Sequence, residues 1–214
     1  LSTGAIEAFR RMRPLIRRGE DYVFLIQAIE NGPVLQNQAD FDGFLCTNQT
    51  RRDAYRRLFY SERVRLQSDD IDRWLALNPM FPGMAEFLRT LRDPGATFVV
   101  TTKDLTSVRL VFERHGISIP EGNLYRATKS IRKPAILDTI AERRRGTSDG
   151  LHFIDDHAAT VLEAARESGA RCLCARWGYN TAEHIASVEA EDIETIALDA
   201  FFDRYSELND SDLL

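Results

Sequence analysis

The sequence lacks any long apolar run and contains few cysteines and histidines. No segment reaches the roughly 18 consecutive apolar residues that a membrane helix needs, so we expect no membrane partner. Three cysteines in 214 residues are too few for a disulfide framework, and four histidines form no cluster with zinc-ligand spacing. Neither internal repeats nor low-complexity segments are present. These absences predict a cytoplasmic, globular protein. Cys172 and Cys174 alternate on a predicted strand over 171–175 and are expected to be buried thiols, while Cys46 has no assigned role.

The charge balance argues against nucleic acid as a partner. The chain has 33 acidic and 28 basic side chains, a formal charge of −5, and no recognisable nucleic-acid module. Arginines nevertheless cluster in the first 66 residues. One or two of them could bind an anionic substrate in a bidentate way, although a solvated helix face explains most such residues. The clusters comprise Arg10, Arg11, Arg13, Arg17 and Arg18, and then Arg51, Arg52, Arg56 and Arg57.

Two adjacent carboxylates, Asp155 and Asp156, are the most informative feature of the sequence. They follow a short apolar run over 151–154, which predicts a strand, and they precede a predicted helix over 158–169. Ligands of parallel sheets collect beyond the carboxyl ends of the strands. Mg²⁺ often binds one or two carboxylates, with water and substrate phosphate as its other ligands. The alternative is that an aspartate only caps the helix.

Two further fragments end in side chains suited to phosphate. The predicted strand over 96–103, ATFVVTTK, places Thr101 and Thr102 near its carboxyl end. Lys133 stands at the start of a predicted helix, next to Pro134, where the helix dipole disfavours a cation unless an anion accompanies it. The simpler interpretations are a solvated lysine and a strand-end hydroxyl that caps the next helix.

In order and spacing, these fragments resemble the second, third and fourth motifs of the haloacid dehalogenase-like hydrolase superfamily. The stretch from Phe81 to Gly116, FPGMAEFLRTLRDPGATFVVTTKDLTSVRLVFERHG, is similar to the region around the second motif in members of the phosphoglycolate phosphatase type. The residues ARWGYNT, after Gly169, are similar to the fourth region of that group. The resemblance covers residues 79 to about 200.

The resemblance implies a fold and a chemistry. The fold would be α/β, a doubly wound parallel sheet with an inserted all-helical cap. The function would be that of a Mg²⁺-dependent phosphatase that acts on a small phosphorylated metabolite through an aspartyl-phosphate. Thr101 and Lys133 would be catalytic and would bind the phosphoryl group with Thr102, which stands where the family usually has asparagine. Asp155 and Asp156 would hold the metal.

The family's first motif, an apolar strand ending in Asp-x-Asp with the nucleophile, is not visible before Phe81. The textual match, Asp40 to Gly43, follows polar residues that do not suit a buried strand, and we interpret it as a loop with Asx turns. We therefore expect the nucleophile strand to lie upstream of Leu1, and we expect the 214-residue chain not to hydrolyse a generic aryl phosphate. Two alternatives remain: a catalytically inactive binding protein of this fold, and a phosphomutase or another hydrolase of the superfamily.

The domain organisation follows from the periodicity. Residues 1–78 predict a helical cap, with helices over 6–18, 22–30, 51–66 and 70–77 and with Asn48 and Ser68 as N-caps. Residues 79–214 predict the α/β core. We expect Thr101, Lys133 and the two aspartates to converge at the carboxyl ends of the strands of this core.

Overall fold

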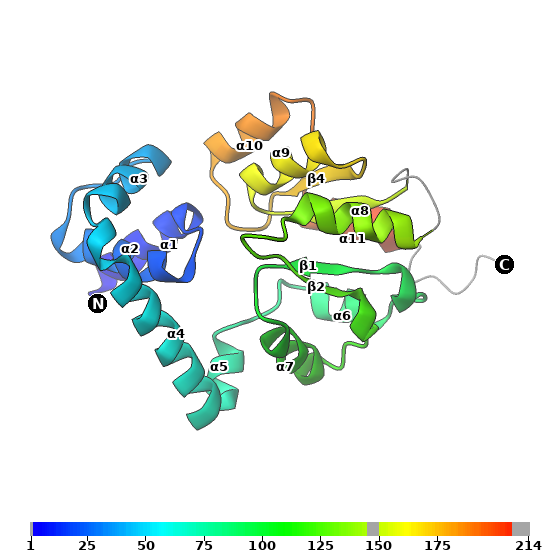
Figure 1. Ribbon diagram of the computed structural model, residues 1–214, viewed down its shortest axis with the longest axis horizontal. Helices are drawn as coiled ribbons and strands as arrows, with labels where there is room; N and C mark the ends of the chain where they lie inside the picture. The colour runs from blue at the N-terminus through cyan, green and yellow to red at the C-terminus, as the bar shows by residue number, and fades with distance from the viewer. Residues whose placement is uncertain (1, 145–149, 207–214) are drawn as a thin grey trace. The chain divides into compact units, whose positions relative to one another are not determined.

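The structure is a computed structural model that describes residues 2–144 and 150–206. The chain divides into two compact units, Leu1–Leu77 and Asn78–Leu214, which are described separately below. The first unit is helical in its described part, and the second contains all the described strands (Figure 1). In the described ranges, no helix combines the length and the apolar character needed to cross a membrane.

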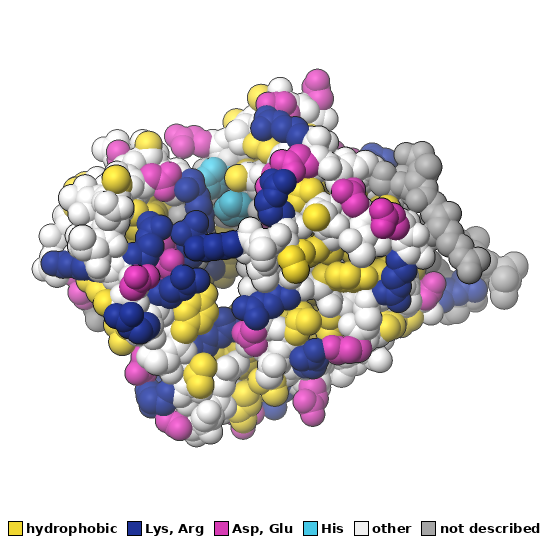
Figure 2. Space-filling model, in the orientation of Figure 1, with side chains coloured by type: hydrophobic (Ala, Val, Ile, Leu, Met, Phe, Trp, Pro, Cys, Tyr) yellow, Lys and Arg dark blue, Asp and Glu magenta, His cyan; other side chains and the backbone are white. Residues whose placement is uncertain are grey.

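The helical unit is organised around α2, which contacts α1, α3 and α4. Phe24, Leu25 and Ala28 of α2 are buried, and Phe41 of α3 is fully buried against them. Lys and Arg side chains gather on the visible face of this unit (Figure 2). The elements are α1 (Thr3–Met12), η1 (Arg13–Leu15), α2 (Gly19–Asn31), α3 (Gln38–Thr47), η2 (Gln49–Arg51), α4 (Arg52–Asp69) and α5 (Ile71–Ala76).

Three details of this unit differ from the sequence-based expectation. Residues Asp40 to Gly43 lie within α3 and not in a loop, because the Asn37 side chain caps that helix by accepting from the Asp40 N–H. Asn48 follows α3 as its C-cap and does not start α4 through its side chain. Ser68 lies inside α4, which ends one residue later, and the cap of α5 is Asp70.

The second unit alternates strands and helices. Its helix boundaries have local causes: the Asp104 side chain caps α7 by accepting from the Ser107 N–H at 2.8 Å, and Gly116 ends α7 with a φ of 64°, which glycine adopts readily. The elements are α6 (Met84–Arg89), η3 (Pro94–Ala96), β1 (Val99–Thr101), α7 (Leu105–His115), η4 (Glu121–Asn123), β2 (Leu124–Arg126), α8 (Lys133–Arg143), β3 (His152–Asp155), α9 (Ala158–Glu167), β4 (Arg171–Ala175), α10 (Ala182–Glu189), β5 (Glu194–Ile196) and α11 (Leu198–Tyr205).

The strands form two small parallel sheets and not one continuous sheet. β1 pairs with β2, with Val99 opposite Leu124, and the second sheet has the order β3-β4-β5, with Asp155 opposite Cys174. No pairing joins β1 to β3 within the described residues. The protein is therefore of the mixed α/β class with parallel strands, and β1 and β3 each have one edge that pairs with no other described strand.

Both faces of the three-stranded sheet are covered. Phe153, Cys172 and Cys174 pack into a cluster with residues of α8, α9 and α10. Leu173 and Ile154, which alternate with them along the strands, pack with α6 and α11 on the opposite face. Val100 of β1 packs against the first cluster too, so the two sheets share one apolar core.

Candidate functional site

Asp155 lies at the carboxyl end of β3, where the apolar strand leaves the sheet. One carboxylate oxygen, Oδ1, accepts from the backbone N–H of His157 at 2.9 Å. The other, Oδ2, forms a hydrogen-bonded ion pair with Lys133 Nζ. The side chains of Asp155 and Lys133 are only 11% and 14% exposed. The pair is therefore mostly shielded from water. Removal of either partner would leave the other charge poorly solvated.

Lys133 is the first residue of α8, directly before Pro134. The partial positive charge at a helix N-terminus disfavours a cation there, and the Asp155 carboxylate supplies the compensating anion. The ammonium group also lies 5.8 Å from the centroid of the Phe153 ring. Lys133 is thus fixed at the carboxyl end of β3 and is not the solvated lysine of the simpler interpretation.

Asp156 is positioned by a loop that follows β4. The backbone N–H of Tyr179 donates to Asp156 Oδ2 at 2.8 Å, and the Asn180 side chain donates to the carbonyl oxygen of Ala175 at 2.7 Å. Gly178 is in close contact with the Asp156 side chain, because an added Cβ would lie 2.5 Å from Asp156 Cγ. Within the described ranges, no hydrogen bond reaches Asp156 Oδ1. One oxygen of Asp156 is therefore held by the protein and the other is open to a ligand.

Gly178, Tyr179 and Asn180 belong to the ARWGYNT stretch, but the sequence did not indicate that they position Asp156. The signal that could have found them is the glycine of WGYN, placed directly after a buried strand. Glycine at such a point often marks a close approach between the backbone and another group.

Thr101 and Thr102 lie at the carboxyl end of β1, on the other sheet. Thr101 Oγ1 accepts from the backbone N–H of Lys103 at 3.0 Å, and Thr102 is exposed. The hydroxyl thus stabilises the turn after β1, whereas Asp104 caps the following helix. Helix α8, which begins with Lys133, contacts β1. The structure joins Lys133 directly to Asp155, and in the described residues no hydrogen bond joins Thr101 to either of them.

Asp40 and His157, the residue after the acidic pair, both lie at the start of a helix. Asp40 lies in the first turn of α3, in the unit whose described residues contain no strand, and it accepts from the Gln36 N–H at 2.8 Å. It is therefore not at a strand end. His157 lies at the start of α9, and its Nδ1 is 3.0 Å from the Thr160 hydroxyl. This contact agrees with packing at the helix start.

The donor set at Asp155 and Asp156 fits Mg²⁺ better than zinc. No group of three or more His, Cys, Asp and Glu side chains with metal-binding geometry occurs in the described part of the chain. Zinc sites use three or four protein ligands, whereas Mg²⁺ is often held by one or two carboxylates and keeps several waters. The open Oδ1 of Asp156 and the remaining lone pairs of Asp155 could supply those two ligands.

The cysteines of β4 are not candidate nucleophiles. Cys172 and Cys174 are both buried on the same face of the strand. Burial raises the pKa of each thiol to about 11, and the neighbouring charges of Asp155 and Asp156 add to the pKa increase of Cys174. Because the thiolate is the reactive form, both side chains remain inert near neutral pH.

We compared the chain with protein-family models, curated proteins and solved structures. None of the three comparisons found a match.

Proposed function

We propose that this protein is a Mg²⁺-dependent, phosphatase-like hydrolase of the haloacid dehalogenase-like type, acting on a small phosphorylated metabolite through an aspartyl-phosphate. One observation carries the proposal: a shielded Lys133–Asp155 ion pair lies directly beside Asp156 at the carboxyl end of a parallel strand. Lysine and paired carboxylates are the groups that neutralise a phosphoryl group and hold its metal ion.

Each residue has a role in this proposal. Lys133 neutralises charge on the phosphoryl oxygens while Asp155 keeps its ammonium group in place. The Thr101 hydroxyl donates a hydrogen bond to a phosphoryl oxygen, and it can do so while it accepts one from the Lys103 N–H. Asp155 and Asp156 hold Mg²⁺, which supplies positive charge to the phosphoryl group when bound.

The arrangement of the strands is compatible with the expected core. In a doubly wound sheet the parallel strands form one layer, yet β1 and β3 each have an edge without a strand partner among the described residues. By the resemblance, the nucleophilic aspartate lies on a central strand that has a neighbouring strand on each side. β1 and β3 would be those strands, and the helical unit would be the cap. We propose this arrangement for the complete active site.

A binding protein without turnover is the second candidate. Within the described residues, the carboxylate that pairs with Lys133 is Asp155, which is already assigned to the metal, and no further aspartate is placed as a nucleophile there. Such a protein would bind Mg²⁺ and phosphate but would not cleave an ester. A phosphomutase would also need the nucleophilic aspartate. Carbon–halogen hydrolysis needs no Mg²⁺, so it would not explain the Asp155 and Asp156 pair.

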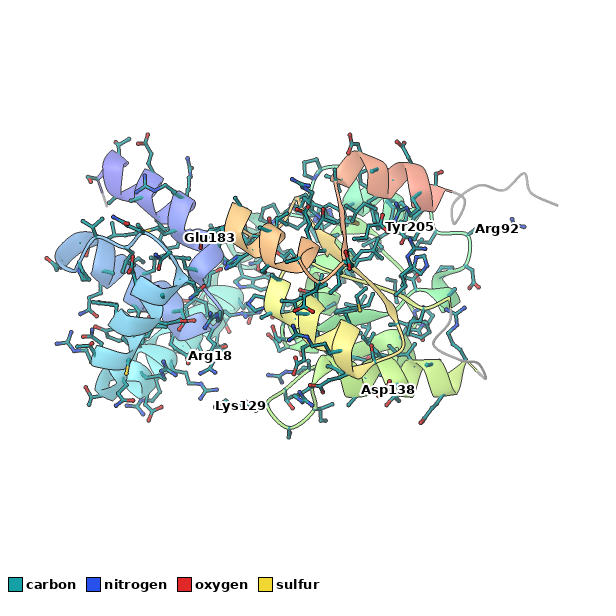
Figure 3. All side chains as sticks on the ribbon, turned by 90° about the horizontal axis from the view of Figure 1, so that it is seen from above. Arg18, Arg92, Lys129, Asp138, Glu183 and Tyr205 are labelled. Atoms are coloured by element: carbon teal, nitrogen blue, oxygen red, sulfur yellow. The ribbon has the colours of Figure 1, made fainter. Side chains whose placement is uncertain are left out.

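Calorimetric titration with Mg²⁺ tests the metal site. We expect the double variant Asp155→Asn, Asp156→Asn to lose Mg²⁺ binding while its circular dichroism spectrum stays unchanged. Asp138→Asn is the matched control, because Asp138 is an exposed carboxylate on α8 (Figure 3). The metal assignment is wrong if the double variant and the control bind Mg²⁺ equally well.

Phosphate binding and turnover separate the two candidate functions. We expect the 214-residue chain to bind tungstate, a phosphate analogue, in the presence of Mg²⁺, and Lys133→Ala to weaken that binding at least about tenfold, the loss of one charge-assisted hydrogen bond. We further expect no hydrolysis of an aryl phosphate by this chain. Hydrolysis that depends on Lys133 would instead show that the described chain is a complete enzyme and would exclude the binding-protein candidate.

A further inference from the structure

The helical unit contains a charged cavity of about 500 Å³. It lies where the start of α2, the middle of α3 and the start of α4 meet, so it belongs to this unit alone. Its charged lining consists of Arg17, Arg18, Asp21, Asp42, Arg52 and Asp53. The arginines come from the two clusters that the sequence shows, which are more than thirty positions apart and which the fold brings together around one cavity.

Two of the three carboxylates have protein partners. Asp42 Oδ1 accepts from Arg17 Nη1 at 3.2 Å and from the Gln38 side chain at 3.0 Å. Asp21 Oδ2 accepts from the backbone N–H groups of Arg17 and Arg18 at 3.0 and 2.9 Å. Burial raises the pKa of Asp21, which opposes its negative charge. Asp42 is therefore paired with Arg17, while Asp21 is held mainly by two backbone N–H groups and also attracts Arg18.

In the described part of the chain, Arg52 has no such partner, and Arg18 has only the Coulombic attraction of Asp21. Among the described residues, neither side chain forms an ion pair, and the Nε–H of Arg52 is buried without any acceptor. A buried donor without a partner carries a free-energy penalty, which is larger when the group is charged. Because Arg52 lines the cavity, a bound anion that reached this N–H would remove the penalty.

Two helix N-termini add to the positive potential. Both α2 and α4 begin at the cavity, and Asp21 and Asp53 occupy their first turns, where a carboxylate offsets the helix dipole. Asp42 is paired with Arg17, and the partial positive charges of the two helix ends offset Asp21 and Asp53 in part, so Arg18 and Arg52 are not fully neutralised. Guanidinium groups match carboxylate and phosphate oxygens in a bidentate way.

We propose that this cavity is a binding site for a small oxyanion, the phosphate or carboxylate group of a metabolite, which Arg18 and Arg52 bind together. The site lies within the helical unit and does not include Lys133. It can therefore be tested independently of the proposed phosphatase function. Of these residues, Arg18 is labelled in Figure 3.

The test uses the full chain with Lys133→Ala, so that the aspartate site does not contribute to phosphate binding. Calorimetry with inorganic phosphate and, separately, with citrate distinguishes a phosphate site from a carboxylate site. We expect Arg52→Ala and Arg18→Ala each to weaken binding of the preferred anion at least about tenfold. Arg56→Ala is the matched control, since Arg56 is exposed on the same helix as Arg52 and outside the cavity. We expect it to change the affinity less than about twofold.

Nuclear magnetic resonance gives a second readout that does not require a folded alanine variant. The Nε–H signal of Arg52, assigned by its loss in Arg52→Lys, should shift in a saturable way as the anion is added. The proposal is wrong if neither anion shifts this signal, or if Arg52→Ala and Arg56→Ala bind phosphate and citrate with equal affinity.

Discussion

Replacing Gly178 with alanine should displace the Asp156 carboxylate. The added Cβ would lie 2.5 Å from Asp156 Cγ, whereas carbon atoms in contact are about 3.5 to 4 Å apart. Because the added Cβ would also overlap Asp156 Cβ, the loop after β4 or the Asp156 side chain must move by more than about 1 Å. Such a shift would break the hydrogen bond from the Tyr179 N–H to Asp156 Oδ2, which is now 2.8 Å long.

The size of the effect follows from that hydrogen bond. A hydrogen bond to a charged group contributes about 1.5 to 3 kcal/mol, so we expect the Mg²⁺ affinity of Gly178→Ala to fall by roughly ten- to one-hundred-fold. Overpacking should also lower the free energy of unfolding by about 1 to 3 kcal/mol. Calorimetry measures the first quantity and urea denaturation the second.

Gly43→Ala provides the control for Gly178→Ala. An added Cβ at Gly43 meets no atom within 4 Å, and alanine is favoured in the α3 helix by up to about 1 kcal/mol. This variant should keep its Mg²⁺ affinity, and its free energy of unfolding should be unchanged or slightly higher. The positioning argument is refuted if Gly178→Ala is folded by circular dichroism and binds Mg²⁺ within about twofold of the unsubstituted chain.

Two further predictions concern β1 and the cysteines. Thr101→Val removes one hydroxyl, so Mg²⁺-dependent tungstate affinity should fall by about 1.5 to 3 kcal/mol, and an isothermal titration that shows no loss would return Thr101 to a purely structural role. A thiol reagent at pH 8 should modify only Cys46 in the folded chain, because Cys46 is exposed while Cys172 and Cys174 are buried. Burial raises the pKa of both thiols from 9.0 to about 11, so between these pH values the folded state binds more protons than the unfolded state. The free energy of unfolding should therefore fall as the pH rises from about 9 to 11. Cys172→Ala and Cys174→Ala, measured by urea denaturation, should each reduce this slope; an unchanged slope in both would contradict the assigned pKa direction.

The sequence predicted the elements of the second unit better than their pairing. Apolar runs placed β1, the start of α8, β3, α9 and β4 to within a few residues, because each depends on a local pattern in the sequence. Periodicity does not say which strands are neighbours. The absence of a pairing between β1 and β3 in the described residues became visible only in the structure.

The helical unit shows why some boundaries were missed. Asp40 to Gly43 resemble a turn when taken alone, yet Asn37 caps a helix across them and the buried Phe41 and Leu45 fix that helix against α2. Tertiary burial thus outweighs local turn propensity. In the same way, a run of arginines does not reveal which ones face a cavity, since that depends on how α2, α3 and α4 pack.

The site was predictable in part for the same reason. Asp155, Asp156 and Lys133 stand out because charged residues at a strand end and a helix start need a counter-charge. Gly178 and Tyr179 act through close packing and a backbone N–H, and these depend on a loop more than twenty residues away from Asp156. Their contribution could therefore not be predicted from the sequence.

The all-parallel pairing of the second unit has a consequence for how the chain folds. Each parallel pair, such as Val99 with Leu124 or Phe153 with Cys172, closes a segment that contains a whole helix, so no strand can pair with its neighbour through a tight hairpin. Pairings between residues distant in sequence form slowly, whereas helix contacts such as those of α1 with α2 are local. During synthesis the helical unit should therefore acquire its structure early. The strands should remain unpaired for longer, and in that interval their apolar segments are the part of this protein most exposed to aggregation.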